Sequence, residues 1–209
     1  MNTKWKTSFA ALVLPLALLV TGRWKMIAAA AVGTLSLLAV SYLAFGAEAW
    51  RGFFDVAAFA RSALEGRMIG DEKMQSAFAA VRVLGGSVTR AWTAQGVVTL
   101  AACGAMALGL RKTGDVATQA AIASCAALLA TPYLYDYDLM LAGLPLLWLF
   151  REGRRTGFLP WEKSVMIAAF LLPLVSRLIG GAIHVPTGPF VLSALFAVVL
   201  TRSKADQLR

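Results

Sequence analysis

The apolar residues of this chain fall into long runs separated by short polar stretches. The runs at 26–45 and 91–110 each have the roughly 20 residues that an α-helix needs to cross a bilayer. Shorter or interrupted runs follow at 116–134, 139–150, 164–183 and 190–201. The pattern therefore predicts an all-α fold, a polytopic transmembrane bundle of about six spanning helices that occupies residues 1–209 as a single membrane domain.

The first apolar run, at 8–21, is too short to span a bilayer as a helix. The alternation of the later loops would also place Lys4 and Lys6 outside, against the positive-inside rule. Three interpretations stay open. The run is a signal peptide, although no small-x-small cleavage site follows it; it is a re-entrant half-helix; or the chain begins within the architecture of a larger protein.

The long loop at 46–90 carries two amphipathic patterns. Trp50, Phe53 and Leu64 recur at helical spacing with charged residues on the opposite face, as in a helix that lies in the membrane interface. A second short helix is predicted between 71 and 86, because acidic residues suit a helix N-terminus and a Gly-Gly pair ends a helix. The two helices either cover the bundle or face a substrate.

Composition supports a membrane protein, since 59% of the residues are hydrophobic and 15% are charged, against roughly 45–50% and about 25% in soluble domains. The net charge of +9 does not indicate nucleic-acid binding, because the basic residues are not gathered on one soluble face. They occupy alternate connections between the apolar runs, as the positive-inside rule describes. These connections hold Arg23 and Lys25, Arg111 and Lys112, Arg151, Arg154 and Arg155, and Arg202 and Lys204.

We therefore expect a multi-pass protein of the cell (inner) membrane, in contact with membrane lipid, whose basic connections face the cytoplasm. The stretches 46–90, 135–138 and around His184 then face outward. Cys103 and Cys125 lie among apolar neighbours and are interpreted as packed thiols. With one histidine and no CxxC or HExxH spacing, we expect no metal site and no cofactor. Gln95 and Gln119 are expected to hydrogen-bond between helices.

The densest polar cluster spans residues 131–138 and combines two carboxylates with three phenols. Tyrosines are common at membrane interfaces, and a proline with two aspartates is ordinary in a loop, so structural interpretations are also open. Arg177 lies inside an apolar stretch, where a cation is normally paired with an acid or directed at an anionic ligand. We predict that Arg177 approaches Asp136, Asp138 or a lipid phosphate at an outward-facing cavity. His184 is a candidate acid or base.

Several short strings follow one another along the chain. They are Leu14-Pro15-Leu16-Ala17-Leu18-Leu19, Gly22-Arg23-Trp24, Phe45-Gly46, Ala49-Trp50, Lys73-Met74 with Ser76 and Phe78, Thr131-Pro132-Tyr133 with Asp136-Tyr137-Asp138, and Gly157-Phe158-Leu159-Pro160-Trp161-Glu162-Lys163. In order and spacing, over about residues 8–185, they resemble the C-terminal half of the bacterial glycosyltransferase family 87.

The resemblance implies a polytopic transferase of the GT-C type that moves a hexose from a polyprenyl-phosphate donor to a glycan or glycolipid outside the cytoplasmic membrane. Mycobacterial mannosyltransferases are among the relatives. The family places its catalytic aspartate, the general base on the acceptor hydroxyl, in the first large outer loop near the N-terminus. No residue here matches that loop. The resemblance thus implies a truncated, by itself inactive chain with no assigned catalytic residue.

The same resemblance implies a lipid-tail groove and cations for the donor phosphate. The candidates for the phosphate are Arg177, Lys73 and Arg67, and those for acceptor positioning or sugar stacking are Asp136, Asp138, Tyr133, Tyr135, Tyr137 and His184. The alternative is a non-catalytic polytopic membrane protein, transporter-like or a structural remnant. A transporter would be expected to contain internal repeats, and the sequence shows no convincing one.

Overall fold

The structure is a computed structural model that describes residues 9–66, 68, 73–183 and 187–207. Every regular element in these ranges is a helix, which confirms the all-α prediction. The elements in chain order are α1 (Phe9–Val20), α2 (Trp24–Glu65), α3 (Ala77–Val83), α4 (Val88–Leu110), α5 (Val116–Ala130), the 3₁₀ helix η2 (Asp136–Ala142), α6 (Gly143–Thr156), α7 (Glu162–Ile183) and α8 (Gly188–Gln207).

Three segments in the described part of the chain are long and apolar enough to cross a membrane: Trp24–Val56, Val88–Leu110 and Gly188–Ala205. The count of about six spans is not confirmed. The run at 116–134 forms a helix of only 15 residues, which at roughly 1.5 Å per residue is too short to cross the hydrocarbon core alone.

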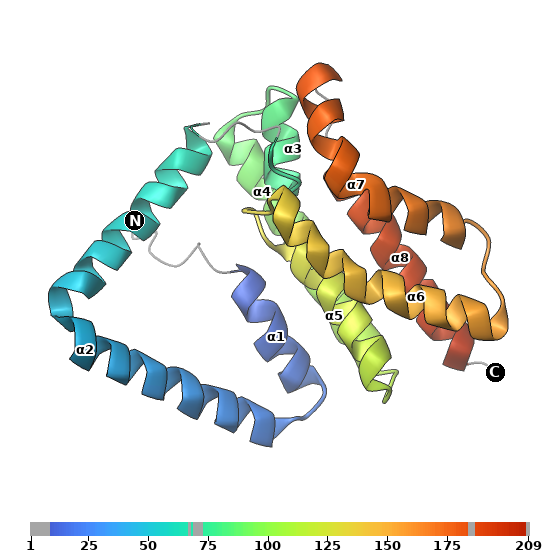
Figure 1. The fold of residues 1–209 in the computed structure, drawn as a ribbon, viewed down its shortest axis with the longest axis horizontal. Coiled ribbons are helices and arrows are strands. Elements are labelled where there is room, and N and C mark those ends of the chain that lie inside the picture. Colours follow the sequence, from blue (N-terminus) through green and yellow to red (C-terminus); the bar gives the residue numbers. More distant parts are fainter. Residues whose placement is uncertain (1–8, 67, 69–72, 184–186, 208–209) are drawn as a thin grey trace.

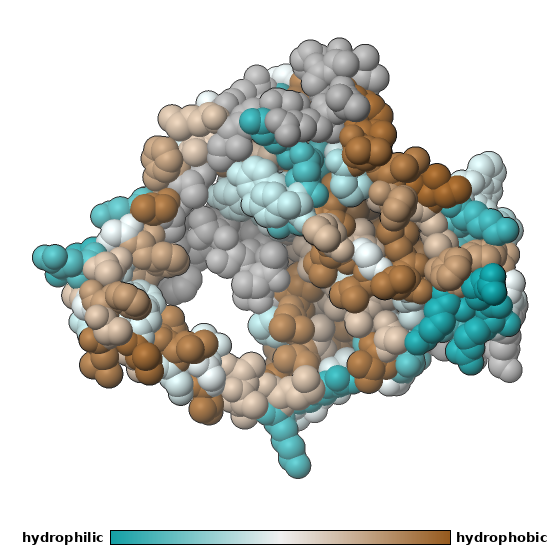
Figure 2. Space-filling model, viewed as in Figure 1, coloured by the Kyte–Doolittle hydropathy of each residue, from teal (hydrophilic) through white to brown (hydrophobic). Residues whose placement is uncertain are grey.

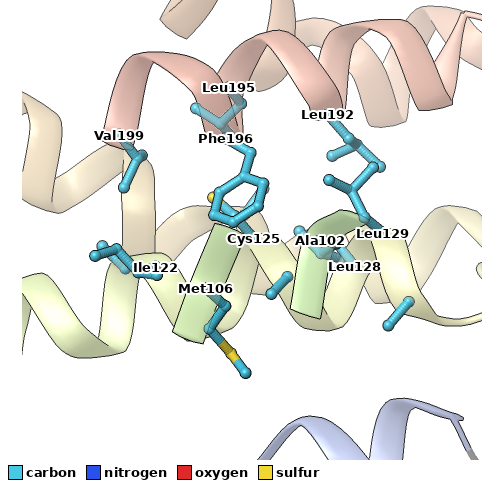
Figure 3. Close-up of a cluster of buried hydrophobic side chains, with 14 of the residues drawn as sticks. Ala102, Met106, Ile122, Cys125, Leu128, Leu129, Leu192, Leu195, Phe196 and Val199 are labelled. Carbon is cyan, nitrogen blue, oxygen red and sulfur yellow. The ribbon is translucent and has the colours of Figure 1, made fainter. Parts of the chain in front are cut away.

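Helix α5 lies at the centre of the bundle and contacts α1, α4, α6 and α8 (Figure 1). Its many alanines leave little side-chain bulk, so the neighbouring helices approach closely. Figure 3 shows this core, where Ile122 and Cys125 of α5 meet Met106 of α4 and Phe196 of α8. The short N-terminal run forms α1, whose Val13 and Ala17 join the same core.

Helix α2 covers two predicted elements, the span at 26–45 and the first amphipathic helix of the long loop, and the predicted boundary between them coincides with a kink at Gly46. It continues for 42 residues through a bend at Gly46, whose φ of 74° and ψ of 177° lie outside the helical region. Only glycine adopts this backbone conformation without steric cost, so the bend is fixed at this position. Beyond the turn after α1, most of α2 stands away from the bundle (Figure 1).

The predicted start of the second loop helix was wrong, and the structure defines a helix start in the run at 139–150 that the sequence left open. The second loop helix, α3, begins at Ala77 because the Ser76 hydroxyl caps it by accepting from Ala79 N at 3.1 Å; residues 71 and 72 lie outside the described ranges. The run at 139–150 begins as a 3₁₀ turn, and the α-helix starts only at Gly143. Pro145 explains this start, because the first turn of an α-helix leaves its N–H groups unpaired and tolerates proline.

The four predicted basic connections gather at one end of the bundle, which we call the basic end. There Arg23 Nη2 donates to Gln119 Oε1 at 2.8 Å, which ties the α1–α2 turn to α5. Asp115 caps α5, and hydrogen bonds from the Thr118 hydroxyl and backbone N–H lower the pKa of its carboxyl. The other end, which we call the tyrosine end, holds α3, residues 131–135, η2 and the first turns of α4 and α8.

Candidate functional site

Two segments far apart in the sequence run side by side at the tyrosine end. Met74 forms an antiparallel bridge with Tyr135, and Gln75 N donates to Leu134 O at 2.8 Å. Met74, Gln75 and Leu134 are all buried. The backbone pairing therefore brings together residues 73–76, which precede α3, and residues 133–138, which lead into η2. We call these two segments the platform.

Within the platform, the carboxylate of Asp136 contacts the side chain of Gln75. Gln75 Nε2 donates to Asp136 Oδ1 at 3.4 Å, and Gln75 is only 4% exposed. The first residue of α8, Gly188, packs directly on Gln75: a Cβ at this position would lie 2.6 Å from both Gln75 Cβ and Gln75 O. The amide side chain thus has little room to move, and it holds the half-buried Asp136 carboxylate in place.

Asp138 has a different task, although it lies only two residues away. Its Oδ2 accepts from Tyr135 N at 2.9 Å, and its own backbone N donates to Tyr135 O at 3.1 Å. This reciprocal bonding starts η2. The two predicted acids therefore differ in their partners. Asp138 accepts from a backbone N–H, whereas Asp136 accepts from the side chain of Gln75.

Tyr135 and Tyr137 form a stacked pair at the edge of the platform. Their ring centroids are 5.5 Å apart with planes at 13°, and Tyr137 is 69% exposed. Burial, followed by the nearby Tyr137 and Asp138, raises the pKa of the Tyr135 hydroxyl. This phenol stays protonated at neutral pH, so it offers a hydrogen-bond donor and an apolar ring face instead of a base.

Gln95 fixes the platform to the bundle. Its Oε1 accepts from Phe78 N at 3.1 Å, and its Nε2 donates to Leu129 O at 3.0 Å. One side chain therefore links α3, α4 and the end of α5. The predicted interhelical hydrogen bonding is confirmed for Gln95, whereas Gln119 bonds to Arg23 in the α1–α2 turn and to Thr113 in the loop before α5. Around Gln95, Tyr133 and Tyr135 pack on a small core cluster that includes Met74 and Phe78.

The predicted phosphate-binding cations are described only in part. Lys73 is exposed and precedes Met74, so it lies at the edge of the platform. Arg67 and His184 lie outside the described residues. Arg177 is part of α7, but its side chain is not described, and its pairing with Asp136 or Asp138 stays a prediction. Within the described ranges, no three His, Cys, Asp or Glu side chains gather closely enough to hold a metal ion.

An apolar groove of about 510 Å³ runs along α2 across the bend at Gly46. Its lining includes Trp50 and Phe53, part of the predicted amphipathic face, and Trp50 also contacts Phe54, with ring centroids 6.1 Å apart. Figure 2 shows hydrophobic surface along much of this helix. The other lining residues are Thr34, Leu37, Leu38, Ser41, Phe45 and Ala49.

Sequence reasoning did not find Gln75 or Gly188 as parts of the site. Gln75 is an ordinary polar residue beside the string Lys73-Met74, and only its contact with Asp136 gives it a role. No sequence pattern around Gly188 indicates its role. A side chain is excluded there because Gln75, more than one hundred positions earlier in the chain, packs against it.

The family model described as glycosyltransferase family 87 matches residues 7–132, which is more than half of the chain. The chain belongs to glycosyltransferase family 87. Comparisons of this family 87 chain with curated proteins and with solved structures found no match in either set.

The matched region of the family 87 chain runs from α1 to the end of α5 and includes Gln75, α3 and Gln95. It stops at Pro132, just before the tyrosines and aspartates of the platform. The resemblance found in the sequence is thus confirmed at the level of the family. Together with the apolar helices, family 87 indicates a membrane glycosyltransferase.

Proposed function

We propose that this chain binds the substrates of a hexosyl transfer from a polyprenyl-phosphate-linked donor to an extracytoplasmic glycan or glycolipid. The observation that carries the proposal is the platform itself, where the Gln75–Asp136 pair adjoins the stacked Tyr135 and Tyr137. A few placed polar groups beside an apolar surface are what a small-molecule site uses to orient its ligand. Hydroxyl groups of a sugar suit the carboxylate, and its C–H face suits an aromatic ring.

In this proposal the tyrosine end faces outward and the basic end faces the cytoplasm. The positive-inside rule supports this orientation, because the basic connections share the end where Arg23 contacts Gln119 and Arg202 contacts Gly157. The acids and tyrosines of the platform then meet substrates on the extracytoplasmic side of a cell membrane.

Two features of the described residues are proposed to bind the donor, one for its phosphate and one for its polyprenyl tail. Lys73 at the platform edge suits the donor phosphate, since a compact ammonium is a common phosphate-binding group. The α2 groove suits the polyprenyl tail, because six of its eight lining residues are apolar and it lies on a long, exposed, apolar helix.

Among these residues, Asp136 is proposed to position the acceptor hydroxyl by accepting its hydrogen bond. Gln75 orients the carboxylate, and the Tyr135 phenol, which is protonated at neutral pH, offers its hydroxyl as a hydrogen-bond donor. The general base that the family resemblance implies is not assigned to any of these groups. The proposal therefore concerns substrate binding and orientation.

Asp136→Asn is expected to reduce hexose transfer about tenfold, because a hydrogen bond to a charged acceptor is worth roughly 1–2 kcal/mol more than one to a neutral amide. The measurement uses membranes that contain the full-length protein from its own gene, supplied with radiolabelled polyprenyl-phosphate mannose or glucose. Transfer of label into the lipid and glycan fractions gives the rate.

Asp55→Asn is the matched control, since it makes the same chemical change on an exposed position of α2 outside the groove lining. Its rate should equal that of the wild type. Equal rates for wild type and Asp136→Asn would contradict the role given to Asp136. A wild-type protein that transfers neither sugar would contradict the proposed donor class.

A further inference from the structure

At the basic end, a buried arginine fastens the loop between α6 and α7. Arg202 of α8 is 1% exposed; its Nη1 donates to Gly157 O at 2.8 Å and to Glu162 Oε2 at 3.1 Å, and its Nη2 bonds the Thr156 hydroxyl. Glu162 is 0% exposed, and the same Oε2 accepts from Leu159 N at 2.7 Å. These bonds give the loop one defined shape.

The fastened loop holds Trp161 outward in an unusual backbone conformation. Trp161 is 80% exposed, and its φ of 64° makes it the sole non-glycine with positive φ in the described part of the chain. A left-handed conformation costs an L-residue roughly 1–2 kcal/mol. An indole exposed to water gains nothing from this strain, whereas an indole at a membrane interface is in its preferred environment.

Exposed cations share the basic end with this tryptophan. Arg154, Lys163 and Lys204 are exposed at the ends of the three helices that Arg202 brings together. Glu152 accepts from Arg151 and Arg155, whereas no ion pair involves Arg154 or Lys204 within the described ranges. Figure 2 shows hydrophilic surface over the ends of α6 and α8.

We propose that Trp161, Arg154, Lys163 and Lys204 form a binding surface for the headgroups of anionic phospholipids. The indole occupies the interface, and the cations contact the lipid phosphates. The occupant follows from two features of the surface: its positive charge complements an anionic leaflet, and its central side chain is the one most suited to the boundary between headgroups and acyl chains.

This surface is separate from the tyrosine end and does not depend on the proposed transfer reaction. The Glu162–Arg202 pair acts as a positioning element, since it shapes the loop that presents Trp161 but is itself buried. Lipid bound here fixes the depth at which α6, α7 and α8 end in the leaflet.

The test titrates phosphatidylglycerol into the purified full-length protein and follows bound lipid by native mass spectrometry, with phosphatidylcholine as the neutral reference. The Arg154→Gln/Lys204→Gln double variant should bind phosphatidylglycerol about 30-fold more weakly, because each cation near an anionic surface contributes roughly fivefold in affinity. Phosphatidylcholine binding should stay the same. All substituted side chains are exposed, so the fold is retained.

Arg51→Gln/Arg90→Gln is the matched control, because both residues are exposed and lie outside the basic end. It should bind phosphatidylglycerol as the wild type does. In nanodiscs, the difference in tryptophan fluorescence between the wild type and Trp161→Phe gives the emission of Trp161. A lipid with a nitroxide on its headgroup should quench this emission. Equal losses of affinity in the two double variants, or quenching of Trp161 by aqueous iodide but not by the nitroxide lipid, would overturn the proposal.

Discussion

Arg202→Ala is expected to lower the free energy of unfolding by about 3–5 kcal/mol, the cost of breaking a buried ion pair from one side. The substitution leaves the Glu162 carboxylate buried with Leu159 N as its remaining hydrogen-bond donor in the described chain. It also removes the donors to Gly157 O and the Thr156 hydroxyl. Equilibrium unfolding in mixed micelles, followed by circular dichroism, measures the change.

Lys204→Ala is the control for Arg202→Ala, because it removes an exposed cation two residues further along the same helix. Its effect should stay below about 0.5 kcal/mol. A double variant that combines Arg202→Ala with Glu162→Leu should recover part of the lost stability, since the stranded charge is gone. A loss below about 1 kcal/mol in Arg202→Ala alone would show that the pair does not fasten the loop.

Gly188→Ala is expected to lower the free energy of unfolding by about 3 kcal/mol, at the upper end of ordinary overpacking costs. The new Cβ would lie 2.6 Å from Gln75 Cβ and Gln75 O, closer than atoms approach without a shift of the backbone. That shift moves Gln75 relative to Asp136, so the rate of hexose transfer should fall as well. The same unfolding and transfer assays measure both effects.

Gly104→Ala provides the matched substitution. A Cβ at Gly104 meets nothing within 4 Å, so this change should be neutral or stabilise α4 by up to about 1 kcal/mol. Transfer should be unchanged. If Gly188→Ala behaves like Gly104→Ala in both assays, the close packing of α8 on Gln75 has no part in the site.

The sequence predicts helices well where apolar runs are long, because length and hydropathy alone determine them at 91–110. Helix boundaries are predicted less evenly. The boundary between the span at 26–45 and the helix of the following loop was predicted, because the apolar run ends at Phe45 and the kink lies at Gly46, whereas the start of α3 at Ala77 was not. The length rule also counted 116–134 as a span, although its described helix is short and surrounded by other helices.

The candidate site was predictable only as a local cluster. Aspartates and tyrosines at 133–138 stand out in any apolar chain, so composition alone drew attention to them. The role of Asp136 depends on its contact with Gln75, which lies 61 residues away, and no periodicity in the sequence predicts that contact. Likewise Arg202 belongs to a basic connection by its neighbours, yet it is buried against Glu162. The positive-inside rule counts the Lys and Arg residues of a connection and carries no information on the partner of any one of them.

The location of the bound sugar donor tests most directly whether the platform at the tyrosine end binds substrate. A polyprenyl-phosphate hexose that carries a diazirine on the sugar ring is photoactivated in membranes with the full-length protein, and the labelled peptides are identified by mass spectrometry. We expect label within residues 73–78 and 133–138, and excess unmodified donor should reduce it. The opposite result would be label that excess donor removes from the α6–α7 loop or the last turns of α8, with none in 73–78 or 133–138. That result would contradict substrate binding at the platform.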